Sequence, residues 1–454
     1  MTDSSSENRS AVVMGGSMAG MLAARVLADR FERVTVVERD ALGTAIEGRK
    51  GVPQGRHTHG LLSGGREALD ELFPGLSEEL KAAGAPAGDI IGDSRWFLEG
   101  GYHCKFTSRL VGLLVSRPFL EGRVRERVRA LANVEFRDRQ SVSGLLASAD
   151  NTRVLGVATP REKLWANLVV DTSGRGSHSP RWLEEMGYAK PMEERVEIGV
   201  HYTTRIFRRR PEDAGGNLAM VIPPTPSGKR GGVALAQESG RWTVTLVSHF
   251  SPGAPLDLSG FIEFSRALPA PDIYELVRGA EPVSEGMSYQ FPASVRRRYE
   301  KLARFPRGYL VLGDALSSFN PIYGQGMSVA ALEAIELRKA LAQKKPDLAR
   351  DFFARAAKVI DIPWSIAVGN DLRMPETSGP RPLVVKLINA YIGKLHKAAH
   401  HDPQVALAFH RVGNLLAPPP SILHPRIAWR VFRGQSSGTA PAVPRTDVQT
   451  ESAT

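Results

Sequence analysis

Cysteine is almost absent from this chain of 454 residues, which contains only Cys104. A single thiol excludes an internal disulfide and the paired redox thiols of disulfide reductases. Long apolar runs are also absent, and none reaches the ~18 residues of a membrane span. Residues 1–10 are polar and lack the apolar core of a signal peptide. We therefore expect a reducing, cytoplasmic location.

The sequence also lacks the clusters used in nucleophilic or metal-dependent catalysis. His57 and His59 lie two residues apart, a spacing that suits metal binding, but no Cys or carboxylate cluster accompanies them. A nucleophile with an associated base is not apparent either. We therefore expect no metal site, and we find no internal repeat.

Acidic residues are outnumbered, because 59 Lys and Arg face 48 Asp and Glu, which gives a formal net charge of +11. Much of the excess comes from arginines at 208–210, 296–298 and between residues 123 and 129. Aromatic residues are not interleaved with them, so nucleic-acid binding is not expected. We interpret these arginines as solvated surface paired with acidic neighbours, namely Glu121, Glu126 and Glu300. Attraction of an acidic cofactor is the alternative.

The chain does contain a glycine segment where a phosphate-binding turn belongs. Residues 11–14 predict a buried strand, residues 21–28 a helix, and residues 34–37 a second strand that ends in Glu38. In such a βαβ unit the helix N-terminus binds a pyrophosphate, and an acidic residue roughly 20 positions later accepts ribose hydroxyls. Ser17 replaces the second glycine of G-x-G-x-x-G but keeps a hydroxyl that can donate to phosphate. The alternative is a glycine turn that only packs a helix on a strand.

A second glycine segment follows the predicted buried strand 309–312 and begins with Gly313 and Asp314. A carboxylate at this place can accept hydrogen bonds from sugar hydroxyls. After Pro321, the glycines within 324–326 allow the backbone to approach a flat ring closely. The helix predicted from residue 327 onward directs the positive end of its dipole toward that ring.

Five motifs occur along the chain in the order found in one enzyme family. They are residues 12–40, R-K-G-V-P-Q-G-R-H-T-H at 49–59, S-R-P-F-L-E at 116–121, D-T-S-G-R-G-S at 171–177, and G-D-A through N-P-I-Y-G-Q-G-M at 313–327. Over most of residues 10–345 the chain resembles the FAD-dependent monooxygenases of the aromatic-hydroxylase fold, especially the polyene epoxidases of polyether antibiotic biosynthesis. The resemblance implies an α/β fold with a Rossmann-like FAD-binding domain, a mostly antiparallel β-sheet substrate domain and C-terminal helices.

The resemblance also implies the cofactor contacts. The residues that would hold FAD are Gly15, Gly16, Ser17, Met18, Ala19, Gly20, Glu38, Arg39, Arg49, Gln54, Arg117, Val142, Asp171, Gly313, Asp314, Pro321, Gly324, Gln325, Gly326 and Met327. The backbone at Val142 would contact adenine, and Asp171 would lie near the pyrophosphate and the nicotinamide approach. The alternative for Asp171 is a turn cap. His57 and His59 either face the flavin or substrate or make hydrogen bonds within their loop.

The predicted organisation alternates between the two domains. The FAD-binding domain is expected in two parts, 1–180, with substrate-region strands at about 85–108, and 291–345. The substrate sheet is expected between them, at 181–290. A helical region is expected at 346–434 and a disordered polar tail at 435–454.

One predicted helix in the C-terminal region has an amphipathic pattern. Its apolar positions are Leu383, Leu387, Tyr391 and Leu395, set among Lys386, Lys394 and Lys397. Packing on the core is the favoured interpretation, and contact with a membrane surface is the alternative.

In the family that the chain resembles, reduced FAD reacts with O2, and a flavin hydroperoxide transfers one oxygen atom to substrate. The resemblance implies a monooxygenase of secondary metabolism that epoxidises or hydroxylates a small apolar polyketide, isoprenoid or aromatic molecule. NAD(P)H or a separate flavin reductase would supply electrons, since no independent nicotinamide-binding unit is visible. Two alternatives are an FAD-dependent reductase of isoprenoid double bonds and a non-catalytic basic binding protein. Halogenation is disfavoured because residues 361–364 scramble the Trp-x-Trp-x-Ile-Pro signature of flavin halogenases.

Overall fold

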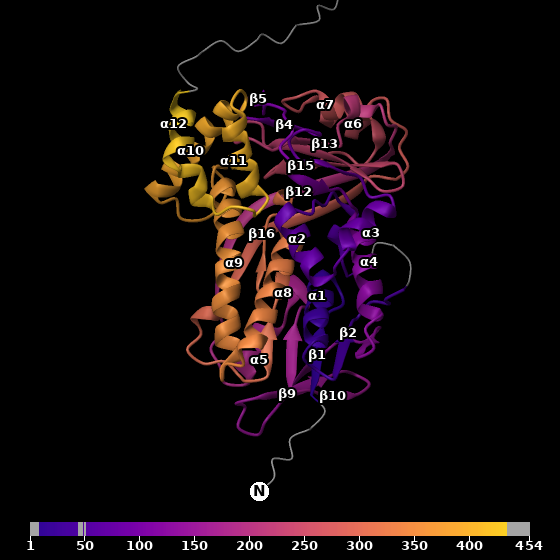
Figure 1. Ribbon diagram of the computed structural model, residues 1–454, viewed down its shortest axis with the longest axis vertical. Coiled ribbons are helices and arrows are strands. Elements are labelled where there is room, and N and C mark those ends of the chain that lie inside the picture. The colour runs from indigo at the N-terminus through magenta and orange to yellow at the C-terminus, as the bar shows by residue number, and fades with distance from the viewer. Residues whose placement is uncertain (1–8, 44–48, 50, 434–454) are drawn as a thin grey trace, which may run out of the picture.

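The computed structural model describes residues 9–43, 49 and 51–433 of the chain. A parallel sheet with its helices occupies the lower half of Figure 1, a large mostly antiparallel sheet the upper right, and a group of C-terminal helices the upper left. The predicted tail, 435–454, lies outside the described residues. The mixed α/β fold with these three parts confirms the predicted fold class.

The lower sheet has five parallel strands in the order β17-β11-β1-β2-β7. Their bounds are Ser10–Met14 (β1), Arg33–Val37 (β2), Val134–Arg137 (β7), Leu168–Asp171 (β11) and Tyr309–Val311 (β17). The central strands are runs of buried β-branched and aliphatic residues, as expected for a sheet covered on both faces. Because all five strands are parallel, β1, β2, β11 and β17 end at the same edge of the sheet, where ligands bind in such folds.

Helices cover this sheet and carry the segments that follow its strands. They are α1 (Met18–Ala28), α2 (Ser63–Leu72), α3 (Leu76–Ala82), α4 (Arg117–Arg129), α5 (Ser179–Glu185) and α8 (Gly326–Gln343). Helix α1 packs against both α4 and α8, so three distant parts of the sequence meet around the first glycine turn. Helix α4 is capped by Ser116, whose side chain accepts a hydrogen bond from the Phe119 N–H at 3.3 Å.

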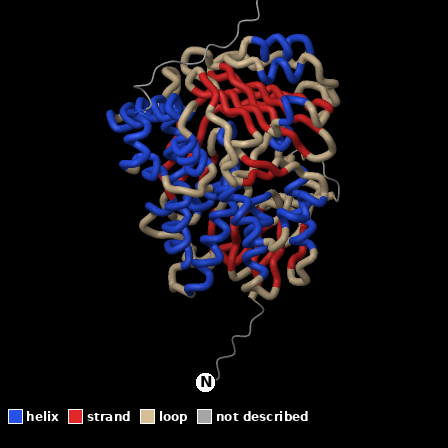
Figure 2. The backbone as a smooth tube through the Cα atoms, turned by 45° about the horizontal axis from the view of Figure 1, so that its top comes forward, coloured by secondary structure: helices blue, strands red, loops and turns tan. Residues whose placement is uncertain are grey.

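The upper sheet has eight strands in the order β18-β16-β12-β15-β14-β13-β4-β5 and is seen nearly face-on in Figure 2. The bounds are Ser94–Leu98 (β4), Gly101–Tyr102 (β5), Met192–Arg208 (β12), Ala219–Ile222 (β13), Arg230–Gln237 (β14), Arg241–His249 (β15), Met287–Arg298 (β16) and Ser317–Ser318 (β18). Helices α6 (Leu258–Arg266) and α7 (Asp272–Val277) pack on it with their own apolar core. Strands from within 85–108 and from 181–290 share this sheet.

Strand β16 crosses the predicted domain boundary at residue 290 and ends at Arg298. The strand extends this far because its arginines pair with acidic residues on the neighbouring strand, whereas in the sequence alone the same arginines look like exposed loop residues. Arg297 lies 3.3 Å from Glu193, and Arg298 lies 2.7 Å from Glu194, both on the adjacent strand β12. The arginine run 296–298 is therefore the end of a strand that reaches back toward the parallel sheet.

Two small sheets complete the strand set. They are β8-β9-β10 (Gly144–Ala147, Val154–Ala158, Lys163–Trp165) and the antiparallel pair β3 with β6 (Ala87–Asp89, Val111–Leu113). The segment around Val134 is β7, the edge of the parallel sheet. The hairpin that follows α4 is β8 with β9.

The C-terminal part is helical, as predicted, and consists of α9 (Leu348–Asp371), α10 (Leu383–Ala399), α11 (Pro403–Gly413) and α12 (Pro425–Arg433). Helices α10, α11 and α12 share a small core of their own. Of the predicted apolar stripe on α10, Leu395 is fully buried, whereas Leu383 and Leu387 are 76% and 71% exposed. Core packing therefore accounts for only the C-terminal half of that stripe. None of the helices in the described ranges combines the length and apolarity needed to cross a bilayer.

Candidate cofactor site

The first glycine turn connects β1 to α1 and depends on two glycines. Gly15 has a φ of +104°, which side chains rarely adopt. A Cβ at Gly20 would lie 1.8 Å from the carbonyl oxygen of Gly15, so no larger residue fits. Ser17 is the N-cap of α1, yet its side chain accepts no hydrogen bond from the helix. The first-turn N–H groups of α1 are therefore not capped by Ser17, which leaves them suited to an anion.

Glu38 lies directly beside this turn, at the end of β2. The Gly16 N–H donates to Glu38 Oε2 at 2.7 Å, and the Asp40 N–H donates to Oε1 at 3.0 Å. The side chain is buried. The structure thus brings the predicted acidic residue to the predicted phosphate turn.

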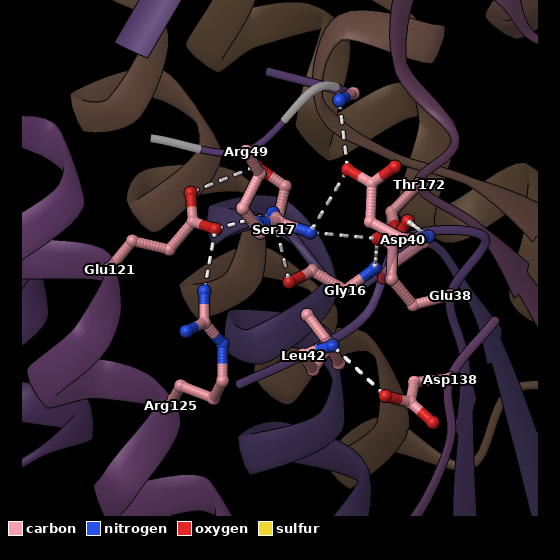
Figure 3. Close-up of polar contacts among 12 residues, drawn as sticks. Gly16, Ser17, Glu38, Asp40, Leu42, Arg49, Glu121, Arg125, Asp138 and Thr172 are labelled. Carbon is pink, nitrogen blue, oxygen red and sulfur yellow. Dashed lines mark hydrogen bonds and ion pairs between the residues drawn. The ribbon is translucent and has the colours of Figure 1, made fainter. Parts of the chain in front are cut away.

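Arg49 lies over the turn and joins it to α4, as Figure 3 shows. Its Nη2 donates to the Gly16 carbonyl oxygen at 3.3 Å and also to Glu121, and its Nη1 lies 3.2 Å from Glu38 Oε2. Burial lowers the pKa of Arg49, but the carboxylates of Glu121 and Glu38 raise it more, so the net direction is upward. Arg49 therefore stays charged between two buried carboxylates at the place predicted for the nucleotide.

Helix α4 supplies the other side of this cluster. Arg117 Nη2 donates to Ser17 Oγ at 3.0 Å, and Ser17 Oγ donates to Glu121 Oε2 at 3.2 Å. Arg125 Nη2 donates to Glu121 Oε1 at 2.9 Å. The serine that replaces a fingerprint glycine is therefore the hydroxyl that links the turn to α4.

The second glycine segment meets the first. A Cβ at Gly313 would lie 2.6 Å from the Cβ of Ala19 in α1, and Gly313 has a φ of +71°. Its N–H donates to Glu333 Oε2 of α8 at 2.7 Å. Next to it, burial raises the pKa of Asp314, while the guanidinium groups of Arg117 and Arg175 lower it, and the net direction is upward. Asp314 thus shares a neighbour, Arg117, with the first turn.

The loop from Pro321 to Gln325 brings the N-terminus of α8 to Asp314. Gly324 has a φ of +63°, and a Cβ there would lie 3.5 Å from the carbonyl oxygen of Gly60, on the loop that contains His57 and His59. Gln325 is buried and is the N-cap of α8 without a capping side-chain hydrogen bond. A Cβ at Gly326 would lie 3.9 Å from Asp314 Oδ1. Met327, in the first turn of α8, is buried.

The large sheet closes this region with aromatic rings from β12 and β16. The ring of Tyr289 lies 5.5 Å from that of His57 and 6.5 Å from that of Tyr202. Arg175 Nη1 donates to the Tyr289 hydroxyl at 3.0 Å, and its guanidinium lies 4.2 Å from the Phe291 ring centroid. One arginine therefore faces both the aromatic wall and Asp314.

The two predicted histidines lie between the domains. His57 Nδ1 is 2.7 Å from Thr204 Oγ1 of β12, and burial lowers the His57 pKa to about 4. His59 Nδ1 is 2.9 Å from the His57 carbonyl oxygen, and burial lowers its pKa to about 3, with Arg117 acting in the same direction. Both rings are neutral near pH 7. Their hydrogen bonds fit the alternative in which both histidines bond within or beside their own loop. The ring of His57 also lies beside that of Tyr289, so His57 is part of the aromatic wall formed with Tyr202 and Tyr289.

Asp171 has the geometry of the turn-cap alternative. It is fully buried at the end of β11, and its carboxylate accepts hydrogen bonds from the Ser173 N–H at 2.8 Å, from Ser177 Oγ at 2.5 Å and from Ser179 Oγ. These hydrogen bonds fit the turn-cap alternative, and the predicted position of Asp171 near the pyrophosphate stays a prediction. Asp171 holds the loop that carries Arg175.

Other predicted contacts lie at the edge of the region. Arg39 is exposed at the end of β2, and Gln54 is half-buried in a 3-10 turn, Pro53–Arg56. Val142 is half-buried and packs on the main core near Gln140, whose N–H donates to the Glu38 carbonyl oxygen at 2.9 Å. These three contacts stay predictions.

The sequence patterns did not assign to the site four residues that organise it: Glu121, Arg175, Tyr289 and Glu333. Glu121 and Arg175 lie inside two of the quoted motifs, and Glu121 follows Arg117 by four residues on one helix face. That spacing was a usable signal. Tyr289 and Glu333 reach the site through β16 and α8, and no local pattern marks them.

The residues present fit FAD on two observations. The uncapped N-terminus of α1 with a buried acid at the end of β2 matches what a pyrophosphate and a ribose require. The late segment contributes the half-buried Asp314, close-approach glycines and a second helix N-terminus, as a flavin ring and its ribityl chain require.

No family model matches the chain. Protein Rv3254 of Mycobacterium tuberculosis (strain ATCC 25618 / H37Rv) is 35% identical to it over 431 residues, and the match covers 89% of each protein. The chain belongs to the family of protein Rv3254.

This member of the Rv3254 family also has similar solved structures. The flavin-dependent brominase Bmp2 superposes with a TM-score of 0.63 at 15% identity, covering 94% of this chain and 98% of Bmp2. PqsL, a probable FAD-dependent monooxygenase from Pseudomonas aeruginosa, superposes with a TM-score of 0.61 at 16% identity, covering 80% of this chain and 97% of PqsL. The fold is therefore that of flavin-dependent monooxygenases, and the predicted fold is confirmed at this level.

Proposed function

We propose that the chain is an FAD-dependent monooxygenase that transfers one oxygen atom of O2 to a small apolar substrate, by epoxidation of an alkene or by hydroxylation. The convergence of the two glycine segments carries the proposal. Gly313 lies against Ala19, and Arg117 donates a hydrogen bond to Ser17 while its charge lowers the pKa of Asp314. A dinucleotide spanning these segments would have its phosphates at α1 and its ring at the N-terminus of α8.

The protein residues would bind and orient the cofactor. Glu38 would accept hydrogen bonds from ribose hydroxyls, and the first-turn N–H groups of α1 would bind the pyrophosphate. Asp314 would bind sugar or ribityl hydroxyls. The N-terminus of α8 would stabilise negative charge at the pyrimidine end of the ring. FAD itself supplies the redox chemistry and the activation of O2.

The character of the wall supports an apolar substrate. Tyr202, Tyr289 and the neutral His57 lie between the two domains, with their ring centroids 5.5 to 6.5 Å apart. Such a wall would exclude water and favour an apolar or aromatic ligand. A polyketide, an isoprenoid or an aromatic molecule would suit such a wall. Among enzymes of this fold, we propose the polyene epoxidases as relatives of this chain.

The first test is the absorption spectrum of the purified protein. A flavin spectrum that is bleached by dithionite and restored by air would support the proposal, and the extracted cofactor should be FAD by mass. Colourless protein that cannot be reconstituted with FAD would overturn it and favour a binding protein.

The second test distinguishes oxygen transfer from reduction. Turnover with apolar polyenes should consume O2 and give a product heavier by one oxygen atom, whereas a product heavier by two hydrogen atoms without O2 uptake would indicate the reductase alternative. Anaerobic bleaching by NADPH or NADH alone would assign direct reduction, and bleaching only with an added flavin reductase would assign a partner. We do not propose halogenation, because residues 361–364 scramble the Trp-x-Trp-x-Ile-Pro signature of flavin halogenases.

A further inference from the structure

Most of the conspicuous arginines are neutralised where they lie. In the run 208–210, Arg208 lies 2.7 Å from Glu281, and Arg210 lies 3.1 Å from Asp213. The run 296–298 is similarly paired, with Arg296 2.6 Å from Asp361. These runs therefore do not account for an unbalanced positive surface.

The unbalanced charge lies in the C-terminal helices. Residues 381–433 contain one acidic residue, Asp402, and eight basic residues: Arg381, Lys386, Lys394, Lys397, Arg411, Arg426, Arg430 and Arg433. Asp402 is engaged by Arg430 at 2.8 Å. Within the described ranges, the other basic residues of this region have no acidic partner within 4.0 Å, and all except Arg381 are exposed. This small region carries more than half of the formal excess of +11.

The same region carries an exposed apolar face. It is formed by Leu383 (76% exposed), Val384 (58%), Leu387 (71%) and Ile388 (44%) of α10 with Trp429 (57%) and Phe432 (52%) of α12. With Leu423, these make up seven of the twelve large apolar side chains that are exposed among the described residues. The concentration on two adjacent helices distinguishes this C-terminal apolar face from scattered surface residues.

The two helices present one continuous face. On α10 the apolar residues recur four apart, so they lie on one side of the helix and lead to Tyr391. The Tyr391 ring lies 6.1 Å from that of Phe432, which joins α12 to this stripe. Lys394 lies over the Phe432 ring at 5.1 Å, and Arg433 lies over the Trp429 ring at 4.8 Å. Figure 1 shows α10 and α12 at the upper left corner, far from β10 at the lower end.

We propose that the C-terminal apolar face is a peripheral membrane-binding surface that enters the interface of bilayers containing anionic lipids. Leu, Val, Ile and Phe side chains would lie at the boundary of the acyl chains, and Trp429 at the level of the headgroups. Lysines and arginines around the face would extend to lipid phosphates. The helices lie in the plane of the interface and do not span the bilayer, in agreement with the absence of a spanning helix from the described residues.

Charge selects the membrane over two other occupants. A second copy meeting this face about a two-fold axis would oppose two basic rims, which costs free energy, whereas anionic headgroups complement them. Residues 434–454 contain no apolar run that matches the face in length. The inference does not depend on the cofactor and stands apart from the proposed oxygenation.

The test is flotation of the full chain with vesicles of phosphatidylcholine, with and without about a quarter of phosphatidylglycerol. We expect binding to the anionic vesicles and its loss as NaCl is raised, because exposed charge interactions are screened. Replacing Lys386 and Lys394 together by Gln should weaken binding roughly 25-fold, at about fivefold per Lys. The matched control replaces two exposed lysines elsewhere, Lys163 and Lys301, and should leave binding unchanged.

The apolar part has an equally close control. Trp429→Ser should lose binding and abolish the blue shift of tryptophan fluorescence on vesicles, whereas Trp165→Ser, at the same 57% exposure on β10, should keep both. Leu383→Ser with Leu387→Ser should reduce binding by at least about tenfold without changing the circular dichroism spectrum, because both side chains are exposed.

Three results would overturn the proposal. One is the absence of salt-sensitive binding to anionic vesicles. Another is a concentration-dependent dimer that the Leu383→Ser, Leu387→Ser variant dissociates while vesicles bind neither form. The third is binding that appears only after removal of residues 434–454, which would assign the face to the chain's own terminus.

Discussion

Glu333 offers the sharpest test of the electrostatics around the second glycine segment. The side chain is fully buried in α8, where Oε2 accepts the Gly313 N–H at 2.7 Å and Oε1 has no hydrogen-bond partner among the described residues. Burial raises the pKa of Glu333 to about 8. The hydrogen bond from Gly313 lowers this pKa, and the nearby Asp314 raises it further. Near neutral pH this side chain is therefore a protonated, uncharged acid.

The sign of the pH effect follows from proton uptake. In the unfolded chain Glu333 ionises near its ordinary pKa of 4.5, and in the folded chain near 8. Between these values the folded state binds one more proton, so stability is fully present below pH 4.5 and falls as the pH rises toward 8. At about 1.4 kcal/mol per pH unit, the loss has an upper limit of roughly 4 to 5 kcal/mol.

Glu333→Gln removes this titration while keeping an amide oxygen for the Gly313 N–H. The variant should match the parent within about 1 kcal/mol near pH 4.5, become progressively more stable than it as the pH rises from 4.5 to 8, and keep a constant advantage above that. For a chain of this size we expect a relative gain of about 4 °C in Tm, from roughly 1 °C per kcal/mol. Differential scanning calorimetry across this pH range measures it.

The matched control is Glu336→Gln, one turn further along α8. Glu336 is paired with Lys339 at 2.7 Å and with Arg355 at 3.4 Å and is not enclosed by the core. Its Tm difference from the parent should not rise with pH. A constant Tm difference between Glu333→Gln and the parent from pH 4.5 to above pH 8 would refute the reasoning that burial keeps this acid neutral.

Two further predictions concern cofactor retention, measured as flavin absorbance per protein after gel filtration. Gly20→Ala should lower FAD content by at least about tenfold, because the new Cβ would lie 1.8 Å from the Gly15 carbonyl oxygen. Gly279→Ala, an exposed position away from the site with no atom within 4 Å of the new Cβ, should retain FAD. Arg117→Ala should weaken FAD binding by about tenfold through loss of a charge-assisted hydrogen bond, and Arg123→Ala, which removes a half-buried arginine paired with Glu126 on the same helix, should not. Unchanged retention in Arg117→Ala would remove that residue from the site.

The parts of the fold that could be predicted are those written in short patterns. The unit from residue 11 to Glu38 has apolar strands, a glycine turn and an acid at fixed spacing, and its geometry follows from these alone. The late segment at Gly313 was predicted in the same way. What could not be predicted from either pattern is their contact, because the position of Gly313 against Ala19 depends on the strand order of the whole sheet.

Residues that act through partners on other elements were harder to predict. Glu121 was assigned to surface pairing, yet it is buried and joins Arg49, Arg125 and Ser17 from three separate segments. The extension of β16 to Arg298 likewise depends on acids in β12 that a single strand does not reveal. Local sequence records the chemical type of such a residue but not its partner.

The apolar stripes of α8 and α10 show that helical spacing alone does not predict whether a stripe is buried, and that the residues flanking the stripe help to decide. Both helices repeat apolar residues at helical spacing, but α8 is buried along its length whereas the first half of α10 is exposed. The difference is in the flanking residues: small side chains such as Ala330 and Ala334 let α8 approach its neighbours, while Lys386 and Lys394 rim the stripe on α10. An apolar stripe flanked by small residues predicts packing against another part of the protein. An apolar stripe flanked by unpaired cations predicts contact with a surface that is both apolar and negatively charged, and for α10 this surface is the interface of an anionic bilayer.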